Sequence, residues 1–210
     1  MTVETGRLET FSDGVFAIAA TLLILNVDTY VRSCSGDAAL AKHLLCGWPS
    51  YIAYIVSFLT IGIIWVNHHT VMNQIARADR TFLMLTVGFL MVVAFIPFPT
   101  GLVAENINGP GARAATVTYG ITLTLTAVMF NAIWFYAAKR RRLLREDADE
   151  RTVRGISKTF VLGPWIYLGA TVLAAVDPTV GAIVFILFAL FWVIESSVFG
   201  RDRSPGDVRP

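Results

Sequence analysis

The sequence predicts an all-α membrane protein with six transmembrane helices. Three observations support this prediction: 55% of the 210 residues are hydrophobic, only 15% are charged, and the mean hydropathy is +0.63. Soluble domains average about 45–50% apolar and about 25% charged residues. The apolar residues also fall in long blocks that carry almost no charge, which excludes a disordered chain and an ordinary soluble domain.

Each helix is predicted from a block of about 18 or more apolar residues, the length that crosses a bilayer. The six helices are expected at about 6–30, 48–75, 79–104, 112–140, 157–176 and 179–199. They form a single domain over 1–199, and the charged, Gly- and Pro-containing segment 200–210 is expected to be a disordered cytoplasmic tail. Uninterrupted apolar runs favour helices over the alternating strands of a membrane barrel.

The basic residues predict how the helices are oriented. With the N-terminus inside, all but three of the 17 Lys and Arg residues lie on the inner side, the exceptions being Arg32, Lys42 and Arg113. The positive-inside rule therefore predicts two cytoplasmic termini in a multi-pass plasma-membrane protein. The 139–156 loop mixes both signs of charge, which favours a solvated helical extension and leaves contact with anionic lipid open. The net charge of +2 argues against a nucleic-acid partner.

The residue types that bind metals and form disulfides are few. Both cysteines, Cys34 and Cys46, lie in the first outer loop. An oxidising outer face allows a disulfide that closes this loop, and two unpaired thiols are the alternative. The adjacent residues His68 and His69 point about 100° apart on a helix and cannot both bind one ion, so no metal site is predicted.

The first predicted helix is unusual because it carries Arg7 and Asp13 at its inner end. Ionisable groups within a membrane helix usually face protein or water and have a partner. The two residues are too far apart to pair on one helix, so each is expected to find its partner on another helix. The second helix has a polar cluster at the same depth, made of Trp65, Asn67, His68, His69, Thr70 and Asn73.

An Asp–His or Ser–His contact between these two helices is therefore expected. Histidines exposed to water at the membrane interface are the alternative. On a helical wheel, the bulky residues of the first helix share one stripe, which comprises Arg7, Phe11, Ile18, Leu22, Leu25 and Thr29. Asp13, Ala17 and Ala20 lie roughly opposite, and their small size predicts that this is the packing face. The aliphatic stripe then faces lipid, the protein core or a symmetry-related copy, and as a pore lining it would form a hydrophobic constriction.

The segment Arg7-Leu8-Glu9-Thr10-Phe11-Ser12-Asp13 resembles the R-x-x-x-F-S-D motif of the transmembrane-protein-175 family of lysosomal and bacterial potassium channels. Two further strings are similar to family motifs: Trp65-Val66-Asn67-His68-His69 to W-x-x-H-H, and Pro97-Phe98-Pro99-Thr100 to the P-F-P-T that ends the third helix. The six spans match the single-repeat bacterial branch. The resemblance covers about the first 100 residues, and the later helices agree in number and hydropathy.

This resemblance implies a homotetramer in which four first helices line a pore for potassium ions, with no cofactor. The family's constriction positions correspond to Ile18, Leu22 and Leu25, and a threonine proposed to contribute to ion selection corresponds to Thr21. The motif residues would support the pore helix structurally: Arg7, Phe11, Ser12, Asp13, Trp65, His68 and His69. On the third helix Thr86 stands where the family often has asparagine, so one contact between helices is expected to differ.

The sequence as a whole predicts a passive, potassium-selective cation channel. It contains no G-x-S-x-G, H-E-x-x-H, P-loop or C-x-x-C motif, so no enzyme is predicted. A proton-coupled secondary transporter or a proton-permeable channel is the alternative, because an intramembrane Asp–His pair can relay protons. A non-conducting scaffold also fits the composition. Thr118-Tyr119-Gly120 lies inside the fourth predicted helix without a pore loop, so helix packing explains it better than a carbonyl filter.

Overall fold

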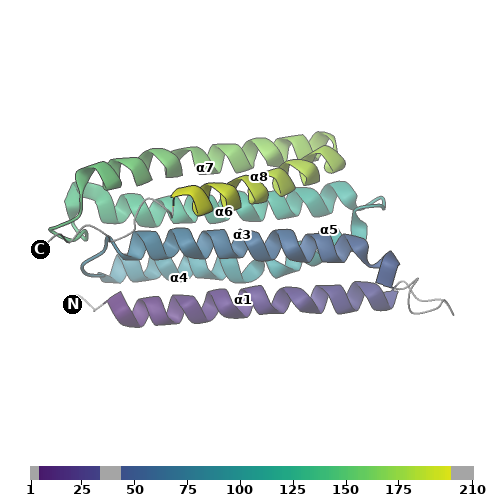
Figure 1. Ribbon diagram of the computed structural model, residues 1–210, viewed down its shortest axis with the longest axis horizontal. Coiled ribbons are helices and arrows are strands. Elements are labelled where there is room, and N and C mark those ends of the chain that lie inside the picture. Colours follow the sequence, from purple (N-terminus) through teal and green to yellow (C-terminus); the bar gives the residue numbers. More distant parts are fainter. Residues whose placement is uncertain (1–4, 34–43, 200–210) are drawn as a thin grey trace, which may run out of the picture.

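The chain folds into a bundle of roughly parallel and antiparallel helices (Figure 1). The computed structural model describes the backbone of residues 5–33 and 44–199, and the side chains of 5–27, 44–139 and 141–192. Its elements are α1 (Thr5–Ser33), α3 (Trp48–Met72), α4 (Arg80–Phe95), α5 (Pro97–Asn106), α6 (Ala112–Ala138), the short 3₁₀ turn η1 (Lys139–Arg141), α7 (Glu150–Val176) and α8 (Pro178–Phe199). No β-strand forms within this described part, so the protein is all-α.

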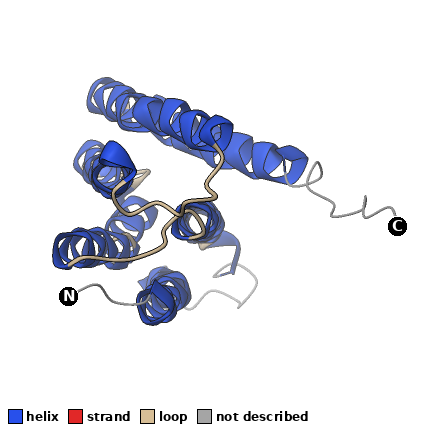
Figure 2. Ribbon diagram, turned by 90° about the vertical axis from the view of Figure 1, so that its left-hand side faces the viewer, coloured by secondary structure: helices blue, strands red, loops and turns tan. Residues whose placement is uncertain are grey.

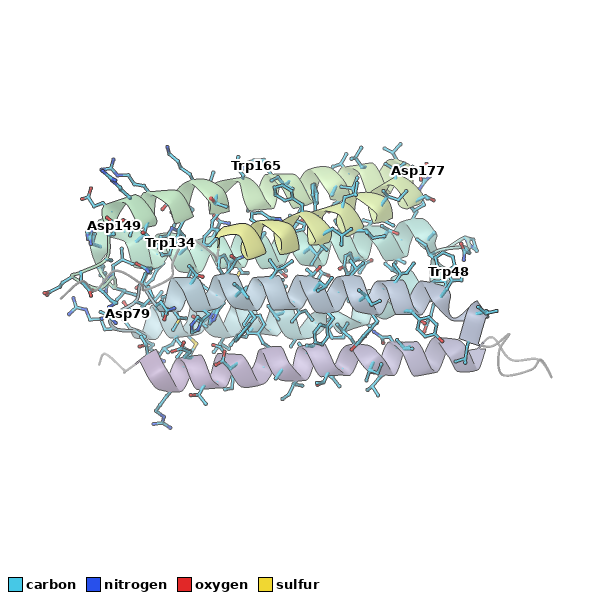
Figure 3. All side chains as sticks on the ribbon, in the orientation of Figure 1. Trp48, Asp79, Trp134, Asp149, Trp165 and Asp177 are labelled. Atoms are coloured by element: carbon cyan, nitrogen blue, oxygen red, sulfur yellow. The ribbon has the colours of Figure 1, made fainter. Side chains whose placement is uncertain are left out.

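Five segments of the described chain are long and apolar enough to cross a membrane, and α4 and α5 together form one of them (Arg80–Asn106). Within α8 the apolar segment whose side chains are described, Pro178–Trp192, is shorter, while the helix backbone continues to Phe199. Asp79 and Asp149 lie at one end of the bundle, and Trp48 and Asp177 lie at the other (Figure 3). The predicted tail 200–210 lies outside the described residues.

Aspartates begin three of the helices. The carboxylates of Asp79 and Asp149 accept hydrogen bonds from backbone amides in the first turns of α4 and α7, at 2.9 and 3.1 Å. Asp177 does the same for α8, at 2.8 Å from the Thr179 amide. The first amides of a helix have no partner within the helix, so an N-cap side chain satisfies them. These caps explain why α4, α7 and α8 each begin directly after an aspartate in the sequence.

The third predicted helix is broken in the structure. We expected one helix over 79–104 that ends at the Pro97-Phe98-Pro99-Thr100 string, but α4 ends at Phe95 and α5 runs from Pro97 to Asn106. Proline lacks an N–H group and its ring clashes with the preceding turn, which interrupts a helix. Both prolines instead occupy the first turn of α5, where that N–H is not needed. The string therefore marks a break within the span.

The loop between α6 and α7 is more structured than the charge pattern predicted. The helical extension covers only residues 150–156, while 142–149 form a loop against the 73–79 connection. The amide of Ala76 donates to the Leu143 carbonyl and that of Arg145 donates to the Gln74 carbonyl, both at 2.9 Å. Leu143 and Leu144 are buried, although the charged residues around them in the sequence predicted a solvated segment. The two inner loops are thus joined.

A row of aromatic rings crosses the bundle from α1 to α7. Phe16 contacts Phe89 on α4, which contacts Phe130 on α6, with ring centroids 6.1 and 5.5 Å apart. Phe130 meets Phe160 of α7 edge-on at 4.8 Å. In lipid, packing of this kind and hydrogen bonds between helices hold a bundle together, because apolar burial alone gives little advantage. The row ties the first helix to the C-terminal half.

Candidate pore helix and its polar anchors

Helix α1 lies at one edge of the bundle, against α3, α4 and α5 (Figures 1 and 2). Its buried face is a regular stripe made of Leu8, Ser12, Phe16, Ala19 and Leu23. The predicted packing face was wrong in part, since Asp13 and Ala17 are exposed and only Ala20 is half-buried. The aromatic side chain of Phe16 occupies the space between α3 and α4, so this larger residue sets the packing face.

The three predicted constriction residues share an exposed side of α1. The exposed fractions are 60% for Ile18, 42% for Leu22 and 58% for Leu25. Thr21 is exposed beside them, and its hydroxyl donates to the Ala17 and Ile18 carbonyls at 2.9 Å. Because the hydroxyl proton is used within the helix, the threonine oxygen remains an acceptor on the exposed surface.

Two polar contacts hold the inner end of α1 against α3. The Trp65 indole Nε1 donates to Asp13 Oδ1 at 2.8 Å, and His69 Nδ1 lies 3.1 Å from Glu9 Oε1. We call these two contacts the inner anchor. Glu9 and Asp13 are four residues apart on α1, and Trp65 and His69 are four residues apart on α3. Because α1 and α3 are antiparallel, each residue of one helix lies opposite its partner on the other.

The inner anchor differs from the expected contacts in its partners. Asp13 bonds Trp65 instead of a histidine, and the Ser12 hydroxyl donates to the Leu8 carbonyl of its own helix at 2.8 Å. Glu9 was missed by the sequence analysis, although its spacing from Asp13 repeats that of His69 from Trp65. Arg7 is exposed, and in the described part of the chain it has no hydrogen bond or ion pair.

His68 is an interior residue, unlike its neighbour. It is 1% exposed, its ring stacks on Phe89 with centroids 5.7 Å apart, and Phe16 lies 5.5 Å away. Its Nε2 atom has no hydrogen-bond partner. The two adjacent histidines therefore have different surroundings: His68 supports the α1–α3–α4 contact by packing, and His69 supports it by a polar contact.

Thr86 of α4 lies in the same interior but bonds within its own helix, to the Phe82 carbonyl at 2.9 Å. The ring contact described between α1 and α4 is the apolar pair Phe16–Phe89. Thr118-Tyr119-Gly120 lies inside α6, and the Tyr119 hydroxyl lies 3.2 Å from that of Ser57 on α3. This buried contact between α3 and α6 indicates that the Thr118-Tyr119-Gly120 string takes part in helix packing.

Cys46 is disulfide-bonded, but Cys34 lies outside the described residues, so the pairing of the two stays a prediction. No group of three or more His, Cys, Asp or Glu residues in the described part of the chain is arranged to hold a metal ion.

Comparison with known proteins decides the family. The family model described as endosomal/lysosomal potassium channel TMEM175 matches residues 7–97. A Chamaesiphon minutus protein described as a potassium channel is 40% identical over 92% of this chain and 96% of its own length. The chain belongs to the TMEM175 family. Its family-matched segment begins at the first motif residue, Arg7, and ends at Pro97, the first residue of α5.

The TMEM175 fold is confirmed by a crystal structure of a lysosomal potassium-selective channel TMEM175 homolog from Chamaesiphon minutus. That structure covers 91% of this chain with a TM-score of 0.79 and 37% sequence identity, and 97% of its own length is matched. A zebrafish relative (Danio rerio), described as an endosomal/lysosomal proton channel TMEM175, is 34% identical over 62% of this chain but only 26% of its own length. TMEM175 proteins are thus described as channels, not as enzymes.

Proposed function

We propose that this chain is a passive, potassium-selective channel whose subunits assemble as a homotetramer around four copies of α1. The relative matched over nearly its full length is described as a potassium channel. The single structural observation that supports a pore role for α1 is the composition of its exposed side. There the bulky residues Ile18 and Leu22 adjoin a threonine hydroxyl and small residues, instead of forming a uniformly bulky lipid-facing surface.

The proposed conduction path narrows at Ile18, Leu22 and Leu25. A ring of aliphatic side chains at this level would exclude water when narrow and pass hydrated ions when wide, so it acts as a gate by dewetting. Thr21 adds a hydroxyl acceptor close to the constriction. Arg7, Phe11, Ser12, Asp13, Trp65, His68 and His69 would then hold the pore helix in place rather than bind ions.

The proposed location is the plasma membrane, with both termini in the cytoplasm. Helix α1 begins at the end of the bundle that carries Asp79 and Asp149, and α8 runs toward the same end (Figures 1 and 3). The same end carries the basic loop residues Arg77, Arg141, Arg142, Arg145, Arg151 and Arg154. The excess of basic residues at this end supports a cytoplasmic position for it.

Flux through purified protein in liposomes tests the proposal. Potassium-loaded vesicles should release K⁺ down its gradient without a proton gradient, and the protein in detergent should have the mass of four copies. Flux that requires a proton gradient, or a monomeric mass, would overturn it. Proton flux without potassium flux would favour the proton-permeable alternative, which the description of the zebrafish relative supports.

Leu22→Asn tests the constriction. We expect a faster K⁺ flux, because a polar amide wets the narrow ring. The matched control is Leu168→Asn on α7, since Leu168 has nearly the same exposed fraction, 43% against 42%. An unchanged flux in Leu22→Asn, or an equal increase in the control, would remove Leu22 from the pore.

A further inference from the structure

The break between α4 and α5 interrupts the regular backbone hydrogen bonds inside the membrane span. Pro97 and Pro99 have no N–H, so the carbonyls of Val93 and Phe95 lose the donors that a regular helix would supply. The Ile96 amide turns tightly onto the Val93 carbonyl at 3.1 Å. Because hydrocarbon offers no replacement, backbone groups at such a break need partners from within the protein.

A contact from α1 lies directly beside this break. The side-chain Nδ2 of Asn26 donates to the Pro97 carbonyl oxygen at 2.7 Å, across 71 positions of the sequence. A carbonyl only accepts, so the amide nitrogen of Asn26 must be the atom that faces it. We call this contact the outer anchor, since it holds α1 at the end opposite to the inner anchor.

The surface of α5 is shaped to receive this amide. A Cβ atom placed on Gly101 would lie 3.0 Å from Asn26 Oδ1 and 3.1 Å from its Cγ. That spacing is tighter than ordinary van der Waals contact, so a Cβ atom at position 101 would push the Asn26 amide away by a few tenths of an ångström. Gly101 thus keeps open the space that the outer anchor occupies.

The break is itself fixed from its other side. Thr100 Oγ1 donates to the Ile96 carbonyl at 2.9 Å and lies 2.9 Å from the Ser57 hydroxyl of α3. The Tyr119 hydroxyl of α6 then lies 3.2 Å from Ser57. Ser57 and Thr100 are 1% exposed. Helix α3 directly, and α6 through Ser57, therefore hold the start of α5, which makes the Pro97 carbonyl a fixed point for α1.

The two anchors bracket the proposed constriction. Asn26 follows Asp13 by thirteen residues, which is about 20 Å along a helix, and Ile18 and Leu22 lie between them. Neighbouring positions on a helix differ by about 100°, so a rotation of α1 by about that angle would replace the Leu22 side chain by the adjacent Thr21. A helix held at one end only could rotate at the other.

We propose that Asn26 is a positioning residue that sets the rotation of α1 at the level of Leu22, through its hydrogen bond to the Pro97 carbonyl. This inference rests on the proposed channel function. Asn26 does not touch the ion; it acts through the orientation of the constriction side chains. Gly101 belongs to the same device, because it provides the space for the amide.

The test compares K⁺ flux and the K⁺/Na⁺ flux ratio per tetramer in Asn26→Leu, Asn26→Gln and Gly101→Ala. Asn26→Leu keeps the size but removes the donor, and we expect flux or flux ratio to change roughly three- to tenfold, the size of one lost hydrogen bond between membrane helices. Asn26→Gln retains the donor and should restore part of the parent behaviour. Gly101→Ala should act in the same direction, and its combination with Asn26→Leu should add little.

The matched control is Asn131→Leu. Asn131 Nδ2 donates to the Phe160 carbonyl at 2.9 Å, an equivalent contact between α6 and α7 that does not involve α1. We expect it to lower thermal stability without changing the flux ratio. Parent flux and ratio in Asn26→Leu, or the same change in Asn131→Leu, would overturn the proposal.

A second measurement keeps the inference separate from the channel function. In a Leu22→Cys background, the rate of labelling at position 22 by a thiol reagent, measured by mass spectrometry, reports the orientation of α1 without ion flux. Adding Asn26→Leu should change that rate at least threefold, and an unchanged rate overturns the proposal. If the parent conducts no potassium but the labelling rate changes, the channel function fails while the outer anchor stands.

Discussion

Asp79 at the inner end of α4 offers the sharpest test of how the cytoplasmic side is held together. Its carboxylate caps α4 through the Phe82 amide at 2.9 Å, accepts from the Tyr136 hydroxyl at 2.8 Å and lies 3.2 Å from Arg142 Nη2. Asp79→Ala removes all three contacts, which join α4, the end of α6 and the 142–149 loop. We expect the variant to be less stable than one that loses a cap alone.

The three contacts contribute unequally. The cap contributes about 1 kcal/mol, and a hydroxyl bonded to a carboxylate contributes about 1.5 kcal/mol. The Arg142 pair adds about 0.5 kcal/mol, because its side chain is 63% exposed and water screens it. The total of about 3 kcal/mol predicts a melting temperature lower by about 6–12 °C, at about 2–4 °C per kcal/mol for a chain of this length.

Asp149→Ala is the control, because Asp149 caps α7 in the same way through the Thr152 amide at 3.1 Å. It should lower the melting temperature by less than Asp79→Ala, because only the cap is lost. Tyr136→Phe, which removes one contact of Asp79, should fall between the two. The assay is thermal unfolding of the detergent-solubilised protein followed by tryptophan fluorescence. Equal losses in the two aspartate variants would refute the claim that Asp79 links three segments.

Three further predictions concern pH, the inner anchor and the aromatic row. The Phe82 amide and other partners hold the pKa of Asp79 below its ordinary value. The contribution of the Asp79 carboxylate to folding stability is therefore complete above about pH 4 and is lost as the pH falls through the lower folded pKa. Between about pH 5 and 3 the melting temperature should fall less in Asp79→Asn than in the parent. Trp65→Phe removes the indole donor of the inner anchor and should lower the melting temperature by the equivalent of about 1 kcal/mol; a parent-like melting curve would contradict the anchor. Phe89→Ala empties a fully buried site and should cost about 3–5 kcal/mol, seen as loss of the folded protein in size-exclusion chromatography, while Phe135→Ala, at a 41% exposed side chain, should retain the folded protein.

The membrane fold could be predicted because hydropathy and length report directly on which segments cross lipid. The failures came where a local rule has two outcomes. A proline string marks either the end of a helix or a break in it, and only the structure shows that the helix resumes at Pro97 and continues to Asn106. Leu143 and Leu144 lie among charged residues, so their burial depends on the 73–79 connection and not on their own surroundings in the sequence.

The candidate site was predictable to a different degree for each face of α1. Periodicity grouped Ile18, Leu22 and Leu25, which lie on one exposed side of α1, and their role as a constriction stays a prediction. It could not identify the buried face, because that depends on which residue fits between α3 and α4. The partner of Asp13 was misassigned for a similar reason, since Trp65 and His69 share a face and differ by one turn. No sequence pattern identified the outer anchor, which requires the position of the Pro97 carbonyl.

The packing of α1 has a consequence for how this protein can vary. Its neighbours are α3, α4 and α5, and the family-matched segment ends at Pro97, where the last of these helices begins. The C-terminal helices are linked to α1 through α4, where Phe89 contacts both Phe130 of α6 and Phe16 of α1. We therefore expect selection on ion conduction to conserve the first half of the chain most strongly. The sequences of α6, α7 and α8 should vary more between organisms, according to the lipids that surround them.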